Sequence, residues 1–383
     1  MKRASIFDRL HQRHSVSDPL EEPSVARCDY VSGRLRIIDG LALTAGGFIR
    51  SGDIPEPPTP ELSSTLYGSD GCRLLMHPVS ATTSVNEPQL GRLDAKALRL
   101  NQLVQTVMAE ALMMLEAVPK ESTFDILLSA PVRSPEAASL IQDRLWGAVA
   151  DTQYGAYLGE IRLAEQEDPH AALAVGEQGG MPYVLWIGVD SLVNEGDIAS
   201  MQYRDILVRS SRGGGLYPGE AVAVLLVQRL TAEAFEFDSG WRLDAGIRRE
   251  HAPRAGRRDY DKRLALVQLL GDLWPATQDD ASSPAPSRLV VDAIGMPGRG
   301  VELGGAVIER WPGIDTIDDA LGVDALVGWS GEATQVLLFV LAAAAIEPEG
   351  HAVVLALHAE SHTQAWALRS YAAEVARRVE DHS

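Results

Sequence analysis

The sequence predicts an α/β protein built from two similar halves. Apolar strands alternate with amphipathic helices along most of the chain, which is typical of a mainly parallel sheet covered on both faces. The segment MPYVLWIGVDSL (181–192) is almost entirely apolar, as buried parallel strands are. The alternation starts again after residue 235, and 383 residues are too many for one small core. We therefore expect an N-terminal half over residues 34–235 and a C-terminal half over residues 236–383.

The N-terminal half is expected to follow a tail and to contain one long helix. Residues 1–33 are mixed in charge and aperiodic, which predicts a partly ordered tail. The segment 51–64 contains four prolines, which lack an amide donor, and is expected to be a surface loop. Leucines and methionines at three- and four-residue spacing predict a long helix over 93–118. The other elements expected in this half are strands at 34–47, 122–131, 181–192 and 221–230 and helices at 135–151 and 170–180.

The C-terminal half repeats this style. Residues 241–250 alternate in polarity and predict a strand, and the Ala-rich segment 331–346 predicts a buried helix. Residues 351–360 and 363–371 fit either a hairpin or a strand followed by a helix. The remaining expected elements are helices at 259–274 and 301–311, a strand at 287–295 and a loop at 275–287.

The segment GGGLYPGEAVAVLLV (213–227) joins a glycine-rich turn to an apolar strand. Glycine permits positive φ and close backbone contact, and Pro218-Gly219 suits a sharp turn. We expect Pro218, Gly219 and Glu220 to have a structural role. A phosphate-binding loop is disfavoured, because the segment lacks the Gly-Lys-Ser/Thr ending and a following helix.

The composition is that of an acidic globular protein. The formal net charge is −19, from 34 Lys+Arg and 53 Asp+Glu, and a polyanion repels nucleic acid and anionic lipid. Cys28 and Cys72 are the only cysteines and lack CxxC spacing, which disfavours a disulfide framework and a zinc site. No apolar stretch has the length of a signal core or a membrane span. We expect a cytoplasmic protein that holds no metal or cofactor.

Three segments carry a resemblance to a known family. VLWIGVDSL (184–192) and the later GGGLYPGEAVAVLLVQRL (213–230) resemble the β-ketoacyl synthases, which have a Gly-x-Asp-Ser-like strand end and a Gly-aromatic-x-Pro-Gly-Glu-Ala turn. RLRIIDGLALTAGG (34–47) resembles their first strand. The resemblance implies the thiolase-like fold, with five layers in the order αβαβα and two pseudo-duplicated halves. It covers most of residues 34–370 by element order, and only the Pro-Gly-Glu region is specific.

The family's catalytic groups have no counterpart at the matching positions. These groups are a cysteine at a helix N-terminus, two histidines and a lysine. The nucleophile would fall in GEIRLAEQEDPHAA (159–172), which has no cysteine, serine or threonine. The glycine-bearing turns of the two histidines remain, but their imidazoles and the lysine are replaced. The positions that correspond to the nucleophile, the first histidine, the lysine and the second histidine, here called the relic positions, are Arg162, Ile294, Asp324 and Trp329.

The resemblance therefore implies a catalytically inactive ketosynthase-like protein. Without a thiolate no acyl-enzyme forms, and without imidazole donors an enolate has little stabilisation. Such a chain would act as a scaffold, an assembly component or a chain-length-factor-like partner, in a homodimer or a heterodimer. A carrier protein or a larger assembly would be a further partner.

Two alternatives stay open. One is an enzyme that acts on acyl-CoA or acyl-carrier-protein thioesters by a non-cysteine mechanism. Its polar candidates are Arg162, Glu165, Glu167, His170 and Asp324. The other is a module that binds a ligand without turning it over, which the bulk of Trp329 disfavours.

Other signals have plainer explanations. His358-x3-His362 would share one face of a helix and could then bind metal, but the preceding VVLAL favours a strand and a turn role. His170 is expected to be an ordinary helix-start residue. The basic segment 248–263 is expected to be a solvated loop and helix start, with a docking patch for an acidic partner as the alternative. The segment SIFDRLHQRH (5–14) is expected to fray, with partner binding as its alternative.

Overall fold

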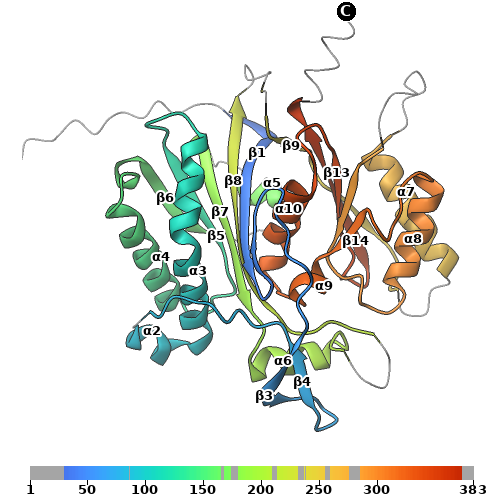
Figure 1. Ribbon diagram of the computed structural model, residues 1–383, viewed down its shortest axis with the longest axis horizontal. Helices are drawn as coiled ribbons and strands as arrows, with labels where there is room; N and C mark the ends of the chain where they lie inside the picture. The colour runs from blue at the N-terminus through green and yellow to red at the C-terminus, as the bar shows by residue number, and fades with distance from the viewer. Residues whose placement is uncertain are drawn as a thin grey trace, which may run out of the picture.

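One mixed β-sheet of twelve strands runs through the described chain (Figure 1). The structure is a computed structural model that describes residues 30–85, 87–164, 168–173, 180–208, 214–231, 237, 239–254, 259–275 and 285–372. The long strand β1 (Tyr30–Thr44) pairs with the short strand β9 (Trp241–Leu243) and so joins the strands of the N-terminal half to those of the C-terminal half. Helices cover both outer faces and also fill the space between the two halves, which gives layers in the order αβαβα.

The N-terminal half has the strand order β6-β5-β7-β8-β1. β5 is parallel to β6 and β7, whereas β8 is antiparallel to both of its neighbours. Helices α3 (Ala95–Met113) and α4 (Pro135–Ala150) cover the outer face, and Asp94 and Ser134 cap their first turns. The strands of this half are β1 (Tyr30–Thr44), β5 (Phe124–Ser129), β6 (Leu158–Leu163), β7 (Tyr183–Ser191) and β8 (Glu220–Thr231), and β2 (Gly47–Ile49) pairs with β1.

The C-terminal half has the strand order β12-β11-β13-β14-β9. β11 is parallel to β12 and β13, and β14 is antiparallel to its neighbours. Helices α7 (Asp259–Leu273) and α8 (Arg299–Arg310) cover the outer face. The strands are β9 (Trp241–Leu243), β11 (Arg288–Val291), β12 (Ala320–Gly322), β13 (Ala352–Ala356) and β14 (His362–Ser370), and β10 (Ile247–Glu250) pairs with β14.

Helix α10 (Ala333–Ala345) lies between the two halves and contacts strands of both. A helix that is apolar on all sides is buried on all sides, which explains its Ala- and Leu-rich sequence. Gly188 of β7 allows the close approach, because a Cβ there would lie 2.6 Å from a methyl carbon of Val336. Helix α5 (Pro169–Leu173) lies in the same layer and contacts β1.

Smaller elements gather at one end of the sheet (Figure 1). A two-stranded hairpin and α6 share a small hydrophobic core with the loops that follow β7 and β11. Helix α9 and the short α2 complete this end and the nearby surface. Their bounds are β3 Glu61–Tyr67, β4 Arg73–Met76, α2 Pro88–Leu93, α6 Glu195–Tyr203 and α9 Val323–Val327; two 3₁₀ turns, η1 (Met114–Ala117) and η2 (Gly155–Tyr157), lie elsewhere.

Four expectations need correction. The sheet is mixed rather than mainly parallel; because helices cover both faces, antiparallel strands here are as uniformly apolar as parallel ones. The single strand expected at 241–250 is two short strands, β9 and β10, which pair with different neighbours. The loop expected at 51–64 ends in β3, and β1 begins at Tyr30, inside the expected tail. Of the two alternatives for residues 351–371, the hairpin is confirmed as β13–β14.

Candidate functional site

Three relic positions meet where the parallel strands of the C-terminal half end. Ile294 follows β11, Asp324 lies in α9 directly after β12, and Trp329 lies between α9 and α10. The Asp324 carboxylate accepts hydrogen bonds from the backbone N–H groups of Ile294 at 3.2 Å and Gly295 at 2.6 Å. Burial raises the pKa of Asp324 to about 6, although these two hydrogen bonds oppose the shift. Asp324 thus closes the turn in which the resemblance expects the first histidine.

The fourth relic position, Arg162, lies in the other half of the molecule. It is part of β6, and its Nη2 donates a hydrogen bond to the carbonyl oxygen of Ala172 in α5 at 3.3 Å. Glu165 and Glu167 lie outside the described residues, as does the side chain of His170, whose backbone belongs to α5. In the strand order β6 is at one end and β12 at the other. The structure therefore brings together Ile294, Asp324 and Trp329 but not Arg162.

The glycine-rich turn before β8 packs backbone against backbone on the segment that carries Trp329. The N–H of Gly219 donates to the carbonyl oxygen of Trp329 at 2.9 Å, and the N–H of Trp329 donates to that of Tyr217 at 2.7 Å. A Cβ at position 219 would lie 1.9 Å from the carbonyl oxygen of Val327. Gly328 has φ +67°, and a Cβ there would lie 2.6 Å from the carbonyl oxygen of Tyr217. Only glycine fits where the two chains approach so closely.

Glu220 connects β8 to α3 through a buried ion pair. Its carboxylate accepts hydrogen bonds from Arg99 Nε at 3.0 Å and Nη2 at 2.6 Å, from Ser191 Oγ at 2.6 Å and from the N–H of Val79 at 2.9 Å. Burial alone would raise the pKa of Glu220, but Arg99 and Ser191 lower it below its usual value. Every acceptor site of the carboxylate is directed at the protein itself, which fits a structural role.

Trp329 packs against the imidazole of His358, and a second imidazole lies near the same turn. The residue is 6% exposed, and its indole ring lies 4.9 Å from the ring of His358 between centroids. On the other side of the turn, the ring of His77 contacts Tyr217 edge to face at 5.8 Å. Burial lowers the pKa of His77, so this second imidazole is favoured in its neutral form. Neither histidine belongs to the segments in which the resemblance places the family's catalytic imidazoles.

A cavity of about 480 Å³ lies beside Trp329. Lys96 is in its wall and forms ion pairs with Asp190 at 2.8 Å and Asp197 at 2.7 Å. Asp190 also accepts a hydrogen bond from the N–H of Glu332 at the start of α10, at 3.0 Å. Burial raises the pKa of Asp190 while Lys96 opposes the shift, and the two carboxylates in turn raise the pKa of Lys96 against the effect of burial. The wall of this cavity is thus a network of paired charges.

His358 forms a pair with Asp292, a residue that the sequence analysis did not single out. Asp292 Oδ2 lies 2.5 Å from His358 Nδ1, and the Asp292 side chain is 1% exposed. The carboxylate also accepts the N–H groups of Leu357 at 2.6 Å and His358 at 3.3 Å. With the carboxylate accepting, Nδ1 carries a proton, and in the neutral imidazole Nε2 then has the lone pair. The pair is therefore built to present a proton acceptor.

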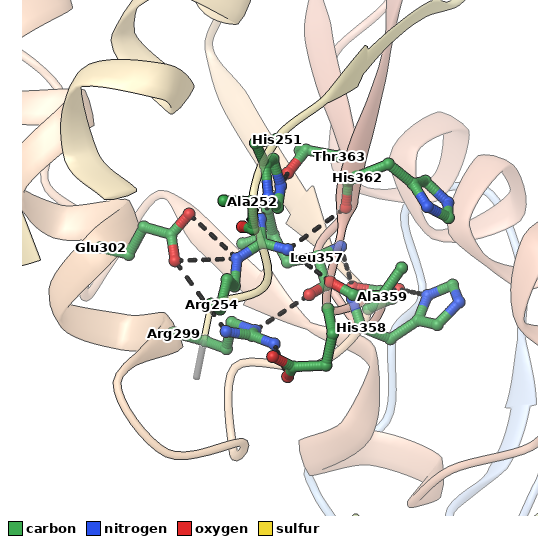
Figure 2. A network of polar contacts seen from close by, with 12 residues as sticks. His251, Ala252, Arg254, Arg299, Glu302, Leu357, His358, Ala359, His362 and Thr363 are labelled. Atoms are coloured by element: carbon green, nitrogen blue, oxygen red, sulfur yellow. Dashed lines mark hydrogen bonds and ion pairs between the residues drawn. The ribbon is translucent and has the colours of Figure 1, made fainter. Parts of the chain in front are cut away.

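Two buried arginines hold the loop that carries His358 (Figure 2). Arg299 Nε donates to the carbonyl oxygen of Leu357 at 2.9 Å, and its Nη2 contacts Glu360 at 2.7 Å. Arg254 Nη1 donates to the carbonyl oxygen of Ala359, and its Nε contacts Glu302 at 3.0 Å. Burial and the neighbouring Arg254 lower the pKa of Arg299. Both guanidinium groups are directed at backbone carbonyls of one short loop.

The described arginines of the basic segment 248–263 have partners within the chain, whereas residues 255–258 and the segment 5–14 lie outside the described residues. In the basic segment, Arg248, Arg249, Arg254 and Arg263 form ion pairs with Glu250, Asp272, Glu302 and Glu309. These pairs weaken the docking-patch alternative, because the arginines already have acidic neighbours. Among the described residues there is no group of three or more His, Cys, Asp or Glu side chains that could hold a metal ion. Within the same residues, no helix is long and apolar enough to cross a membrane.

The cysteines do not complete the site in the described chain. Cys72 is exposed, in the turn between β3 and β4, and Cys28 lies before the first described residue. The nucleophile segment 159–172 contains none.

Comparison with known proteins gives matches of structure only. No protein-family model and no curated protein matches the sequence. A solved structure described as the ishigamide ketosynthase/chain length factor has a TM-score of 0.53 at 12% identity, over 89% of this chain and 100% of that one. Acetamide-bound OleA of Xanthomonas campestris matches with a TM-score of 0.45 at 11% identity, over 88% and 99%. AbyA1, a tetronic acid condensing enzyme, matches with a TM-score of 0.44 at 14% identity, over 88% and 100%.

The likeness to the ketosynthase/chain length factor structure bears on the fold. Identities of this size do not carry an activity from one chain to another. The mixed sheet with helices on both faces and between its halves agrees with the ketosynthase/chain length factor structure over almost the whole chain. The protein has a thiolase-like α/β fold.

Proposed function

We propose that this chain is a ketosynthase-like subunit that forms no carbon–carbon bond itself and acts as a scaffold, an assembly component or a chain-length-factor-like partner. The observation that carries the proposal is the local structure around Asp324 and Trp329. The carboxylate of Asp324 is bound to two backbone N–H groups, and Trp329 is buried with both its N–H and its carbonyl oxygen bonded to the turn before β8. Side chains built into the fold in this way replace the groups that would run a condensation.

A free strand edge supports the role as a partner. β6 pairs with β5 on one side and is the last strand at its end of the sheet in the described chain. Such an edge presents backbone N–H and C=O groups to which another strand can be added. A ketosynthase/chain length factor is among the proteins that share this fold. We therefore propose that the chain forms either a homodimer or a heterodimer with an active homologue.

Two measurements test the proposal together. The purified chain is incubated with acyl-CoA thioesters and its intact mass is measured, with an active condensing enzyme of the same fold as the positive control. We expect no covalent acyl adduct on the chain, whereas a stoichiometric adduct on residues 159–172 would refute the proposal. In parallel, the tagged chain is purified from its source cells, and its mass in solution is measured by light scattering. One stoichiometric partner or a homodimer is expected, and a strictly monomeric chain contradicts the partner role.

The second candidate function is an enzyme that acts on acyl-CoA or acyl-carrier-protein thioesters without a cysteine. One specific observation favours it, the imidazole of His358 beside Trp329. Release of free thiol from an acyl-CoA, without any adduct on the protein, would support this candidate, whereas the partner role is decided separately by the mass in solution.

A further inference from the structure

We propose that His358 and Asp292 form a general-base site that activates water for attack on an activated carboxylic ester or thioester. This inference goes beyond the partner role proposed above, because a subunit that forms no carbon–carbon bond can still hydrolyse an ester. It rests on the positions of the two side chains, on the proton arrangement that Asp292 imposes and on the support of the loop.

The two side chains lie where ligands bind in sheets of this kind. Asp292 directly follows β11, and His358 lies two residues beyond the end of β13. The strands are parallel neighbours in which Val291 pairs with Leu355, so both chain ends leave the sheet at the same edge. Ligands of open α/β sheets bind outside the carboxyl ends of the strands. The third parallel strand, β12, leads at the same edge to Asp324 and Trp329.

The contacts of Asp292 determine which nitrogen of His358 can act. In the described chain, the donors to its carboxylate come from the loop of residues 357–358, and one of them is Nδ1 of His358 itself. Nδ1 therefore keeps its proton and Nε2 presents the lone pair. The side chain of His358 is 36% exposed, and none of the described residues forms a hydrogen bond with Nε2. The imidazole side chain is therefore partly open to solvent.

The loop that carries His358 is held by two buried arginines, which is more than a surface turn requires. The side chains of Arg254 and Arg299 are 2% and 3% exposed, and removing a guanidinium group from water is expensive unless it is fully paired. Glu302 is buried with them, whereas Glu360 is half-exposed and supplies part of the pairing from the loop itself. Other N–H groups of the two arginines donate hydrogen bonds to the carbonyl oxygens of residues 357, 359 and 362, around His358 (Figure 2). A base held in one orientation needs support of this kind.

The step is balanced by one proton transfer in each direction. Nε2 of His358 takes a proton from water as the water oxygen attacks the acyl carbon, and the imidazolium is stabilised by Asp292. The carbon–oxygen or carbon–sulfur bond to the leaving group then breaks. The imidazolium returns the proton to the alkoxide, phenolate or thiolate, which leaves a carboxylic acid and an alcohol, phenol or thiol.

The experiment measures hydrolysis of p-nitrophenyl acetate by the full chain. A general base contributes about 10²–10⁴-fold, so we expect His358→Gln to lower the rate above the buffer background at least ~100-fold. Loss of the orienting carboxylate in Asp292→Asn is expected to lower it by about 10–100-fold. The matched control is His362→Gln, which removes an imidazole from the same hairpin and should leave the rate unchanged. Circular dichroism spectra establish that each variant is folded.

A rescue experiment distinguishes loss of the base from a purely structural effect of the substitution. In His358→Gly, imidazole added to the buffer should restore hydrolysis more strongly than in His362→Gly, because only the first variant leaves a space beside Asp292. Equal rates for the wild type and His358→Gln, or no rescue by imidazole in a folded His358→Gly, would overturn the inference. Neither outcome bears on the partner role, which fails separately if an acyl adduct forms on residues 159–172 or no partner is found.

Discussion

Replacement of Gly219 by alanine tests whether the turn before β8 needs direct backbone contact. The added Cβ would lie 1.9 Å from the carbonyl oxygen of Val327, and ordinary contact begins at 3.4 Å, so the two segments must separate by 3.4 − 1.9 = 1.5 Å. A separation of that size would stretch the bond from Gly219 N–H to Trp329 O from 2.9 Å to beyond hydrogen-bonding distance. The neighbouring bond between Trp329 and Tyr217, at 2.7 Å, is exposed to the same movement.

The expected loss follows from these contacts. Overpacking costs about 1–3 kcal/mol, and each buried backbone group left without a partner costs about 1–3 kcal/mol. We therefore expect Gly219→Ala to lower the free energy of unfolding by about 3–5 kcal/mol, a large part of the roughly 5–15 kcal/mol typical of a folded protein. Urea denaturation followed by tryptophan fluorescence and by circular dichroism measures the loss.

A control in the same molecule separates this effect from the general effect of adding a methyl group. Gly147 lies in α4, where a Cβ would have nothing within 4 Å. Gly147→Ala should raise the free energy of unfolding by about 0.5–1 kcal/mol, because glycine is unfavourable inside a helix. A loss below ~1 kcal/mol for Gly219→Ala would refute the close approach that the turn is proposed to require.

Two further predictions concern buried carboxylates. Glu220→Gln breaks the ion pair with Arg99 and should lower the free energy of unfolding by ~2–4 kcal/mol at neutral pH. Because the folded-state pKa of Glu220 is lowered, its contribution is present above the unfolded pKa and is lost as the pH falls through the folded value, so urea denaturation should show the difference from wild type shrinking in acid. For Asp324 the sign is opposite: with a folded pKa of about 6 against 3.8, the folded state binds the extra proton, and stability falls as the pH rises between these values. The shift corresponds to about 3 kcal/mol, and Asp324→Asn should flatten the stability profile over this pH range; a profile that stays as steep as wild type contradicts the assignment.

Local sequence patterns identify the elements that have a clear period or a clear cap. The helix expected at 135–151 is observed as α4 (Pro135–Ala150), with Ser134 as its cap and a proline in the first turn. The long apolar segments 181–192 and 331–346 are β7 and α10, because burial on all sides leaves little room for polar residues. In these elements the residues that the local pattern requires are also the residues that the tertiary environment requires, so the sequence predicts them.

Elements without such a period were missed. β6 has the sequence LGEIRL and lies at the edge of the sheet. Its charged residues interrupt the apolar pattern by which a strand would be predicted. α6 is short and buries only two apolar residues, Ile198 and Met201, which is too little for a recognisable helical period. The β3–β4 hairpin follows a proline-rich loop that predicts no regular structure. Their formation depends on the core that they share with residues far away in the sequence.

The candidate site likewise contains residues that local sequence predicts and residues that it does not. The turn at Pro218-Gly219 could be predicted, because its residue types have a local conformational reason. The pair of His358 and Asp292 could not, since the two residues are 66 positions apart and meet only through the register of β11 and β13. The burial of Arg254 likewise depends on its approach to Glu302 and to the carbonyl oxygens of the β13–β14 loop. Its sequence context alone predicts an ordinary solvated arginine.

Trp329 links the stability of the fold to the proposed loss of condensation. If the indole fills space that an active enzyme would leave for substrate, its removal creates a cavity inside the molecule. Trp329→Ala should then lower the free energy of unfolding by about 3–5 kcal/mol, whereas Trp329→Phe, which keeps a ring in contact with His358, should lose less than half of this. Urea denaturation of both variants measures the two losses. A loss under ~1 kcal/mol for Trp329→Ala would mean that the indole is not a packing residue, and the position would then have to be regarded as part of a binding site rather than as its replacement.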